Sequence, residues 1–193
     1  RTVSPATTPI SVDEIKQQAV ITHADDDLLL SNLLAAAVAH LDGYSGILGR
    51  CQNNQEWEFG VAEWPRRLPL PFPDVSAVSI AYVDADGVSQ AVAGADYTVI
   101  ACAGSSSVQF RESFGYPALQ PDNALPITIT LTAGYGPGAD DVPASIKQAA
   151  LLLVAHWYAN REAVSAGEMV EVPMTVESLL TPHRVSFLRC ALL

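Results

Sequence analysis

The stretch DVPASIKQAALLLVAHWYANR, residues 141–161, has the pattern of a long helix. Asp141 is a good N-cap residue, Pro143 is tolerated in a first helical turn, and no glycine or proline interrupts the rest. The apolar residues fall on two sides: Ile146, Ala149, Ala150, Leu153 and Trp157 form one stripe, and Leu151, Val154 and Tyr158 line the other. Such a helix must be covered on more than one face, either by the rest of the chain or by a neighbouring subunit.

Length and charge limit the class of protein. A chain of 193 residues is long enough for one domain, or one domain with an insertion, and for a sizeable core. The net charge of -11, with only 10 Lys and Arg, argues against static binding of nucleic acid phosphates. An acidic surface does suit a channel through which DNA slides, although many soluble proteins are simply acidic.

Cysteine usage and hydropathy limit the cellular compartment in which the protein is expected to fold. Cys51, Cys102 and Cys190 are far apart and form no CxxC pair, so we expect no disulfide framework and no zinc site. This cysteine usage is typical of a protein in a reducing compartment. The two most apolar runs, residues 28–41 and 149–159, are shorter than the roughly 20 residues that span a bilayer. Residues 1–10 lack the apolar core of a secretory signal, so we expect no membrane partner.

The first part of the chain reads as helical. Residues 1–10, rich in Thr and Pro, are expected to be flexible, and residues 11–46 to form helices. Ser11 and Glu14 fit a capping box, which predicts a helix over residues 12–19. Asp25, Asp26 and Asp27 precede a Leu- and Ala-rich helix, and we interpret them as capping residues whose carboxylates also complement the N-terminal end of the helix dipole. Consecutive helical residues point about 100° apart, so these aspartates do not predict a metal site.

Residues 51–133 change to the alternation of strands. We expect five or six short strands here, ending with ITITLT at residues 127–132, and a hairpin turn at DADG, residues 84–87. The prolines of residues 65–73 predict an extended, polyproline-like edge connection. The fold class is therefore α+β: a helical frame of two long helices plus short terminal helices, with an inserted antiparallel β-sheet. Residues 141–166 supply the central helix, and residues 167–193 a C-terminal docking segment with a short helix at 174–180.

The search for reaction chemistry gives no candidate. The four histidines are scattered, and the chain contains no HExxH, no nucleophile elbow and no phosphate-binding glycine loop. We therefore predict no catalytic residues, no cofactor and no metal ligands. An apolar C-terminal segment instead calls for a docking partner, either its own domain or another protein.

Taken together, the segments resemble the head-tail connector, or adaptor, family of tailed bacteriophages and gene transfer agents. The matching stretches, in order, are HLDGYSG, NNQEWEF, LPLPFPDVSAVSIAYVDADG, DYTV, ITITLTAGYG, VPASIKQAALLLVAHWYANRE and VPMTVESLLTPHR. Each is a plain helix or hairpin signal, so the resemblance lies in their order and spacing over nearly the whole length. The Ser-rich connection after Cys102 and the final RCALL have no counterpart.

The resemblance implies a structural subunit of a ring, typically of twelve copies, in the neck of a virion or phage-like particle assembled in the bacterial cytoplasm. Its partners would be the portal protein above, a stopper or tail-completion protein below, and translocating DNA in transient, non-specific contact. The portal-docking residues it implies are Thr181, Pro182, His183, Arg184, Val185, Phe187 and Leu188. The ring-interface residues it implies are Leu151, Tyr158 and Arg161.

Other functions stay open at this stage. The nearest is a stopper or tail-terminator subunit of the same neck. More distant are a small acidic hydrolase with its site on the β insertion, and a glycan-binding module that presents Trp57, Trp64 and Tyr82. We further expect the segment from Thr181 onward to be loose in the free subunit and to become ordered on docking.

Overall fold

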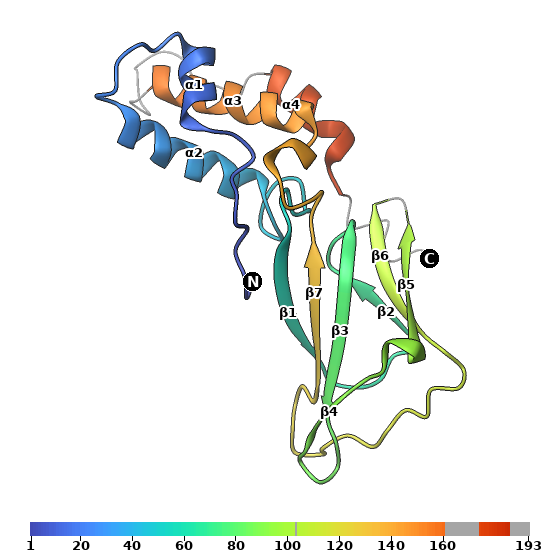
Figure 1. Ribbon diagram of the computed structural model, residues 1–193. Helices are drawn as coiled ribbons and strands as arrows, with labels where there is room; N and C mark the ends of the chain where they lie inside the picture. Colours follow the sequence, from blue (N-terminus) through green and yellow to red (C-terminus); the bar gives the residue numbers. More distant parts are fainter. Residues whose placement is uncertain (103, 161–173, 186–193) are drawn as a thin grey trace, which may run out of the picture. The chain divides into compact units, whose positions relative to one another are not determined.

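The computed structural model describes residues 1–102, 104–160 and 174–185 of the chain. These residues form two compact units. The helical unit comprises Ala6–Asn53 and Gly136–Arg184, and the strand unit comprises Arg1–Pro5 and Asn54–Tyr135, together with Val185. The strand unit interrupts the helical unit in the chain (Figure 1), and the predicted α+β class is confirmed.

Helix α1 (Val12–Ala19) begins with the predicted capping box. The Glu14 N–H donates to the Ser11 hydroxyl at 3.2 Å, and the Ser11 N–H donates to the Glu14 carboxylate at 2.7 Å. The Ser11 hydroxyl also donates to the Glu14 carboxylate, at 2.8 Å, and the two hydrogen bonds that Ser11 donates lower the pKa of the Glu14 carboxyl from its ordinary value. Ile15 is the buried residue that holds α1 on the unit. The cap therefore fixes where the helix starts, and one apolar side chain fixes which face it buries.

Helix α2 (Asp27–Leu41) buries Leu30, Leu34, Ala37 and Leu41, which share one face at helical spacing. The expected role of the preceding aspartates was only partly right. Asp26 occupies the N-cap position but makes no capping hydrogen bond, because its carboxylate accepts the hydroxyl proton of Tyr158. Asp27 lies in the first turn and forms an ion pair with Lys16. The acidic run thus ties α2 to both α1 and α3.

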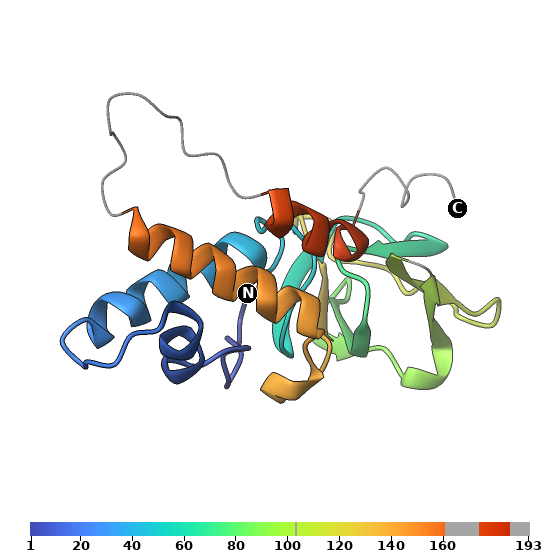
Figure 2. The ribbon, with the colours of Figure 1, turned by 90° about the horizontal axis from the view of Figure 1, so that it is seen from above.

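Helix α3 (Ala144–Ala159) lies along the other helices of its unit: α1, α2 and α4 (Met174–Leu180) all pack on it, and Figure 2 shows α1 and α4 along its sides. Its fully buried residues are Ile146, Ala149, Ala150, Leu153 and Val154. Val154, which we had assigned to the second side, is thus covered within the subunit. Trp157 is half-buried and meets the His40 ring edge-on, with ring centroids 6.3 Å apart.

The start of α3 was predicted two residues too early, since the N-cap is residue 143 rather than residue 141. Pro143 takes the N-cap position, and Val142 before it has an extended backbone, as residues before proline favour. Asp141 instead ends the short 3-10 helix η2 (Ala139–Asp141), and its carboxylate accepts the Gly138 N–H at 2.8 Å. Asp141 is therefore a cap of the turn before α3 rather than of α3 itself.

The strand unit consists of two antiparallel sheets rather than the single sheet we expected. In the first, the spatial order is β1 (Gln55–Val61), β7 (Ile127–Ala133), β3 (Val75–Val83) and β4 (Ser89–Ala91). In the second, the order is β2 (Arg67–Leu70), β6 (Ser105–Phe110) and β5 (Tyr97–Cys102), with the short 3-10 helix η1 (Gly94–Asp96) before β5. Figure 1 shows both sets of strands.

Strand β7 runs between β1 and β3, and its alternating sequence is explained by burial of one face. Ile127, Ile129 and Leu131 are buried, and the threonines between them are half-buried. The two sheets contact one another through the Tyr97 hydroxyl, which donates to the Val78 carbonyl at 2.7 Å. Burial of Tyr97 raises the pKa of its hydroxyl above the ordinary value.

The proline-rich segment 65–73 contains a strand, β2, where we had expected only a polyproline-like connection. β2 pairs with β6 at the edge of its sheet, so the expected edge position is correct. Proline is compatible with this place, since an edge strand needs backbone donors on one side only. By contrast the DADG hairpin is as predicted: the Asp84 carboxylate accepts the N–H groups of Asp86 and Val88, and Gly87 supplies φ +81°.

The beginning of the chain is paired, although we had expected residues 1–10 to be flexible. The Thr2 N–H donates to the Glu56 carbonyl at 2.9 Å, and the Glu56 N–H donates to the Val3 carbonyl at 3.1 Å. These bonds form a β-bridge between Val3 and Glu56 on the first residues of β1. The Thr and Pro content of residues 1–10 therefore did not predict backbone pairing with a residue 53 positions away in the sequence.

Candidate functional site

The described part of the C-terminal segment is built into the helical unit. α4 buries Val176 and Leu180, and the 3-10 helix η3 (Thr181–His183) follows it directly. The Thr181 hydroxyl donates to the Glu177 carbonyl at 2.7 Å, and Arg184 forms an ion pair with Glu177 at 3.7 Å. Residues 181–184 thus make local contacts within the helical unit, whereas most of the segment that we expected to be loose, residues 186–193, lies outside the described residues.

His183 links this segment to the start of α3. Its Nε2 lies 2.7 Å from the Ser145 hydroxyl, a hydrogen-bonding distance. Burial lowers the pKa of the His183 imidazole from its ordinary value, and the Arg50 guanidinium lowers it further. The neutral imidazole is therefore the form that fits this position best.

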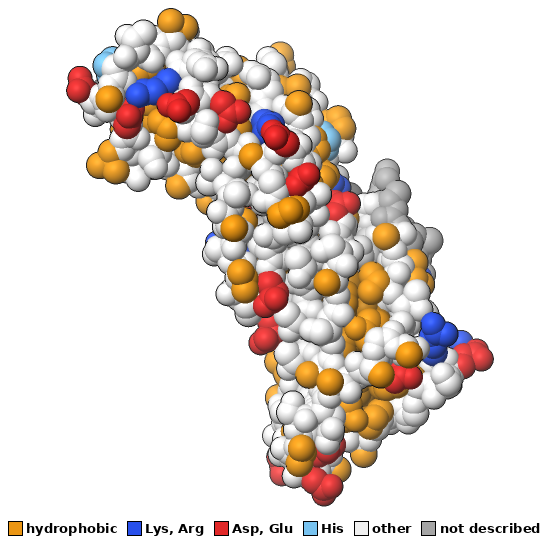
Figure 3. Space-filling model, viewed as in Figure 1, with side chains coloured by type: hydrophobic (Ala, Val, Ile, Leu, Met, Phe, Trp, Pro, Cys, Tyr) orange, Lys and Arg blue, Asp and Glu red, His pale blue; other side chains and the backbone are white. Residues whose placement is uncertain are grey.

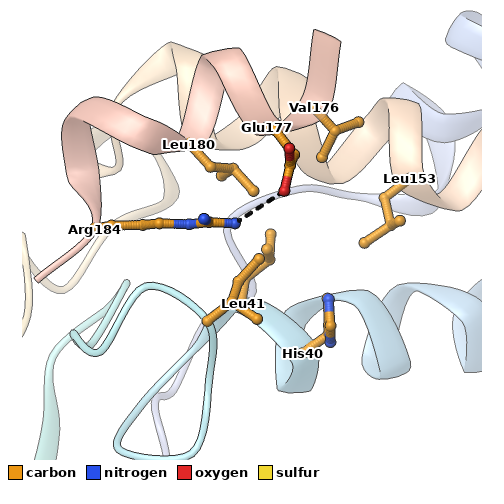
Figure 4. Close-up of a pocket in the computed structure, with 8 residues that line it drawn as sticks. His40, Leu41, Leu153, Val176, Glu177, Leu180 and Arg184 are labelled. Carbon is orange, nitrogen blue, oxygen red and sulfur yellow. Dashed lines mark ion pairs between the residues drawn. The ribbon is translucent and has the colours of Figure 1, made fainter. Parts of the chain in front are cut away.

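A cavity of about 200 Å³ opens beside the segment within the helical unit. Figure 4 shows His40 and Leu41 of α2, Leu153 of α3, and Val176, Glu177 and Leu180 of α4 around it, with Arg184 reaching Glu177. The lining is apolar apart from His40 and the ion pair at its rim. This arrangement offers a recess for an apolar side chain but no cluster of groups for acid-base chemistry.

The structure brings the described portal-docking candidates together at one place. Thr181, Pro182 and Arg184 are exposed, and His183 and Val185 are half-buried. Thr181 and His183 belong to η3, and Arg184 caps it through its N–H, which donates to the Thr181 carbonyl at 3.4 Å. Phe187 and Leu188 lie outside the described residues. The four exposed or polar positions therefore form a surface next to the cavity.

The ring-interface candidates are less exposed than we expected. Leu151 and Tyr158 are both half-buried, and the Tyr158 hydroxyl donates to the Asp26 carboxylate within the subunit. Arg161 lies outside the described residues. Tyr158 thus has a structural role between α3 and α2, and part of the Leu151 surface remains exposed.

Several exposed apolar side chains on the helical unit had not been singled out, among them Val20 and Leu28. Val20 is 83% exposed and Leu28 is 76% exposed, on either side of the α1 to α2 connection. Val20 also has φ +56°, a left-handed conformation that β-branched residues rarely adopt. The sequence did not predict the exposure of Val20, because no local pattern indicated that this residue is the C-cap of α1. Both side chains are candidates for contacts with other subunits.

The aromatic residues considered for glycan binding serve packing. The Trp57 ring lies 5.0 Å from that of buried Phe72. The Trp64 ring meets those of Tyr82, Phe110 and Phe114 edge-on, at 5.1 to 5.5 Å, and its indole N–H donates to the Pro117 carbonyl. These rings join the strands to the 111–117 loop, and Trp64 also lines an open pocket with Arg66, Glu112 and Tyr116.

The charged side chains of the described residues do not gather into one patch on the face shown in Figure 3. On the face in Figure 3, acidic side chains are spread over helices and strands rather than gathered in one cluster. Among the described residues, no group of three or more His, Cys, Asp or Glu side chains is placed to hold a metal ion. Within the same part of the chain, no helix is long and apolar enough to cross a membrane.

Attachment of η3 to α3 is expected to weaken in mild acid. Because the pKa of His183 is lowered on folding, its contribution to stability is present above its ordinary pKa of about 6.5 and is lost as pH falls through the lower folded value. Amide exchange of residues 181–185, corrected for intrinsic rates, should be faster at pH 5 than at pH 7.5. The variant His183→Gln should lose this pH dependence, whereas an unchanged pH dependence in that variant would refute the role of His183.

These features define a class: a small α+β protein whose distinguishing surfaces are a docked C-terminal segment and exposed apolar positions. The sequence model of the head completion protein family matches residues 8–186. The chain belongs to this family, and the predicted kinship with head-tail connectors, a group of structural particle proteins, is confirmed.

Solved structures of low sequence identity share the fold. A chain from the virion of a native gene transfer agent particle superposes with TM-score 0.74 at 21% identity, covering 96% of each chain. Chains from the necks of an empty particle computed with C6 symmetry and a native particle computed with C12 symmetry both give TM-score 0.70, at 23% and 22% identity and again 96% coverage of both chains. A comparison with curated proteins gives no match.

Proposed function

We propose that this chain is the adaptor subunit of a head-tail connector: a ring-forming protein between the portal and the stopper or tail of a phage or phage-like particle. The observation that carries the proposal is the family match over residues 8–186, supported by a fold shared over 96% of the chain with neck proteins of gene transfer agent particles. The C12 symmetry used for one of those necks supports a ring of twelve copies.

The surface at η3 supports a docking role toward the portal. Thr181, Pro182 and Arg184 are exposed there, while the Ser145–His183 hydrogen bond and the Glu177–Arg184 ion pair hold the segment at a fixed place on its unit. A pre-positioned segment loses little conformational entropy on binding, which favours affinity. The cavity beside it would receive an apolar side chain of the partner.

Contacts between neighbouring copies would use the other exposed apolar positions. A ring requires a head-to-tail interface, in which one side of a subunit meets a different side of the next. Leu151 on α3 and the pair Val20 and Leu28 supply two separate candidate surfaces. The net charge of -11 would let DNA pass the assembled ring without tight binding, because phosphates and carboxylates repel.

The adaptor role excludes catalysis in our proposal, in keeping with the structural particle proteins of the family. A second candidate within the same neck is a stopper or tail-terminator subunit, which the family match favours equally. The two roles differ in their partner: an adaptor must bind the portal directly, and a stopper must bind below an adaptor ring.

Binding to purified portal rings separates these roles. The full chain is mixed in parallel with the portal and with the tail-side neck proteins of its particle, and complexes are separated by size. We expect a stable complex with the portal, whether or not tail-side proteins also bind. Binding only to tail-side proteins would refute the adaptor role and favour the stopper.

A further inference from the structure

Strand β5 lies at the end of its sheet, and within the described part of the chain nothing pairs with its outer edge. The Phe110 N–H donates to the Arg66 carbonyl, toward β2, so alternation along β6 turns the backbone groups of Gln109 and Ser107 toward β5. Their partners on β5 are Thr98 and Ile100. The backbone N–H and C=O groups of Val99 and Ala101 therefore point away from the sheet.

The described strand itself has none of the sequence features that normally prevent pairing with other chains. The strand sequence, YTVIAC, contains no charge, proline or glycine, and its six-residue register with β6 is unbroken. Thr98, Val99 and Ala101 are exposed, Val99 to 37%. Natural edge strands are usually short, charged, bulged or interrupted by proline. The outer edge of β5 is therefore suited to pair with a further strand.

The other three sheet edges of the strand unit are each protected. β1 carries Glu56 and Glu58 and already pairs with Val3 at its start. β2 contains Pro69, and β4 is only three residues long. Among these four edges, only that of β5 lacks such protection in the described residues.

We infer that the outer edge of β5 accepts an extended segment from a second copy of this chain, in the ring proposed above, on which this inference rests. An open uncharged edge would promote aggregation unless it were covered throughout the life of the assembly, and a ring neighbour is the partner that is always present. Each copy carries a charge of -11, so contact at an uncharged strand avoids placing carboxylates opposite one another.

The pairing must be head-to-tail. Pairing of β5 with β5 of another copy would close a two-fold dimer and stop ring growth, so the segment that meets β5 comes from a different part of the neighbour. Backbone hydrogen bonds along the strand supply the affinity in such strand addition, and side chains contribute less.

The variant Val99→Pro tests the inference directly. Proline removes an outward N–H, while the hydrogen bonds between β5 and β6 are made by the neighbouring residues and stay intact. The variant should fold, with a thermal midpoint close to that of the wild type, but form multi-copy species at least tenfold less readily. Val99→Ala keeps the N–H and removes most of the side chain, and should assemble within about threefold of the wild type. Native mass spectrometry of the full chain, alone and with portal rings, measures both.

Each outcome decides a separate point. Loss of assembly by Val99→Pro alone, with protection of the Val99 and Ala101 amides from exchange in the wild-type assembly, supports strand addition. Rings of Val99→Pro equal to those of the wild type overturn the inference and leave the proposed function standing. Rings of Val99→Pro that fail to bind another neck protein also overturn it, because the edge then serves a different partner. A wild type that forms no multi-copy species in either setting overturns both the ring and the inference.

Discussion

Replacing Ile146 with aspartate is expected to unfold the helical unit. Ile146 is fully buried on α3, the helix on which α1, α2 and α4 all pack. The change removes a large apolar side chain from the core and places a carboxylate there, so a loss of at least about 4 kcal/mol is expected. Because domains are stable by only about 5–15 kcal/mol, most of this unit's stability would be lost. Urea unfolding followed by circular dichroism measures the effect.

Leu151→Asp on the same helix is the matched comparison. Leu151 is only half-buried, so its carboxylate can reach water, and we expect a loss of stability of about 1 kcal/mol. If Leu151 meets a neighbouring copy, assembly should fall at least tenfold while the subunit stays folded. Equal unfolding by both substitutions would show that Leu151 belongs to the core, and unchanged assembly would remove it from the ring interface.

Ending the chain after Leu180 is expected to abolish attachment to the portal while leaving both units folded. The truncated chain keeps Val176 and Leu180, the buried side chains of α4, and loses the hydrogen bond of His183 and the ion pair of Arg184. Such contacts contribute about 1–2 kcal/mol together, which is less than the stability of a domain. Portal affinity should fall at least a hundredfold, as measured by surface plasmon resonance with immobilised portal rings.

Two controls make the truncation informative. Ser145→Ala removes the hydrogen bond to His183 from the α3 side without changing the docking segment, and should bind the portal within a few-fold of the wild type. A chain that ends after Val185 lacks Phe187 and Leu188 and separates their contribution from that of residues 181–185. Unchanged attachment of the chain that ends after Leu180 would eliminate the segment as the portal contact.

Local signals predicted the elements of this fold well. The capping box at Ser11 and Glu14 gave the bounds of α1, and the alternation of ITITLT gave the buried face of β7, because both patterns depend on neighbours in the sequence. The errors came from partners distant in the chain. Asp26 was interpreted as a cap, but a tyrosine 132 residues away takes its carboxylate. Pairing of residues 1–3 with β1 had no local signal either.

The candidate site was predicted in part for the same reason. The apolar C-terminal sequence indicated a docking segment, but only the structure showed that His183 and Arg184 contact their own unit. The exposure of Val20 and the open edge of β5 depend on how helices end and strands are ordered in space, which periodicity does not encode. Tertiary context therefore decided which apolar residues remained available for partners.

Imaging the neck of its own particle by electron cryomicroscopy tests most directly whether this chain forms a ring between portal and tail. We expect a ring of copies directly below the portal, with the segment that contains Thr181, Pro182 and Arg184 in contact with the portal. A neck in which this chain touches only tail-side proteins, or in which it forms no ring, would contradict the account.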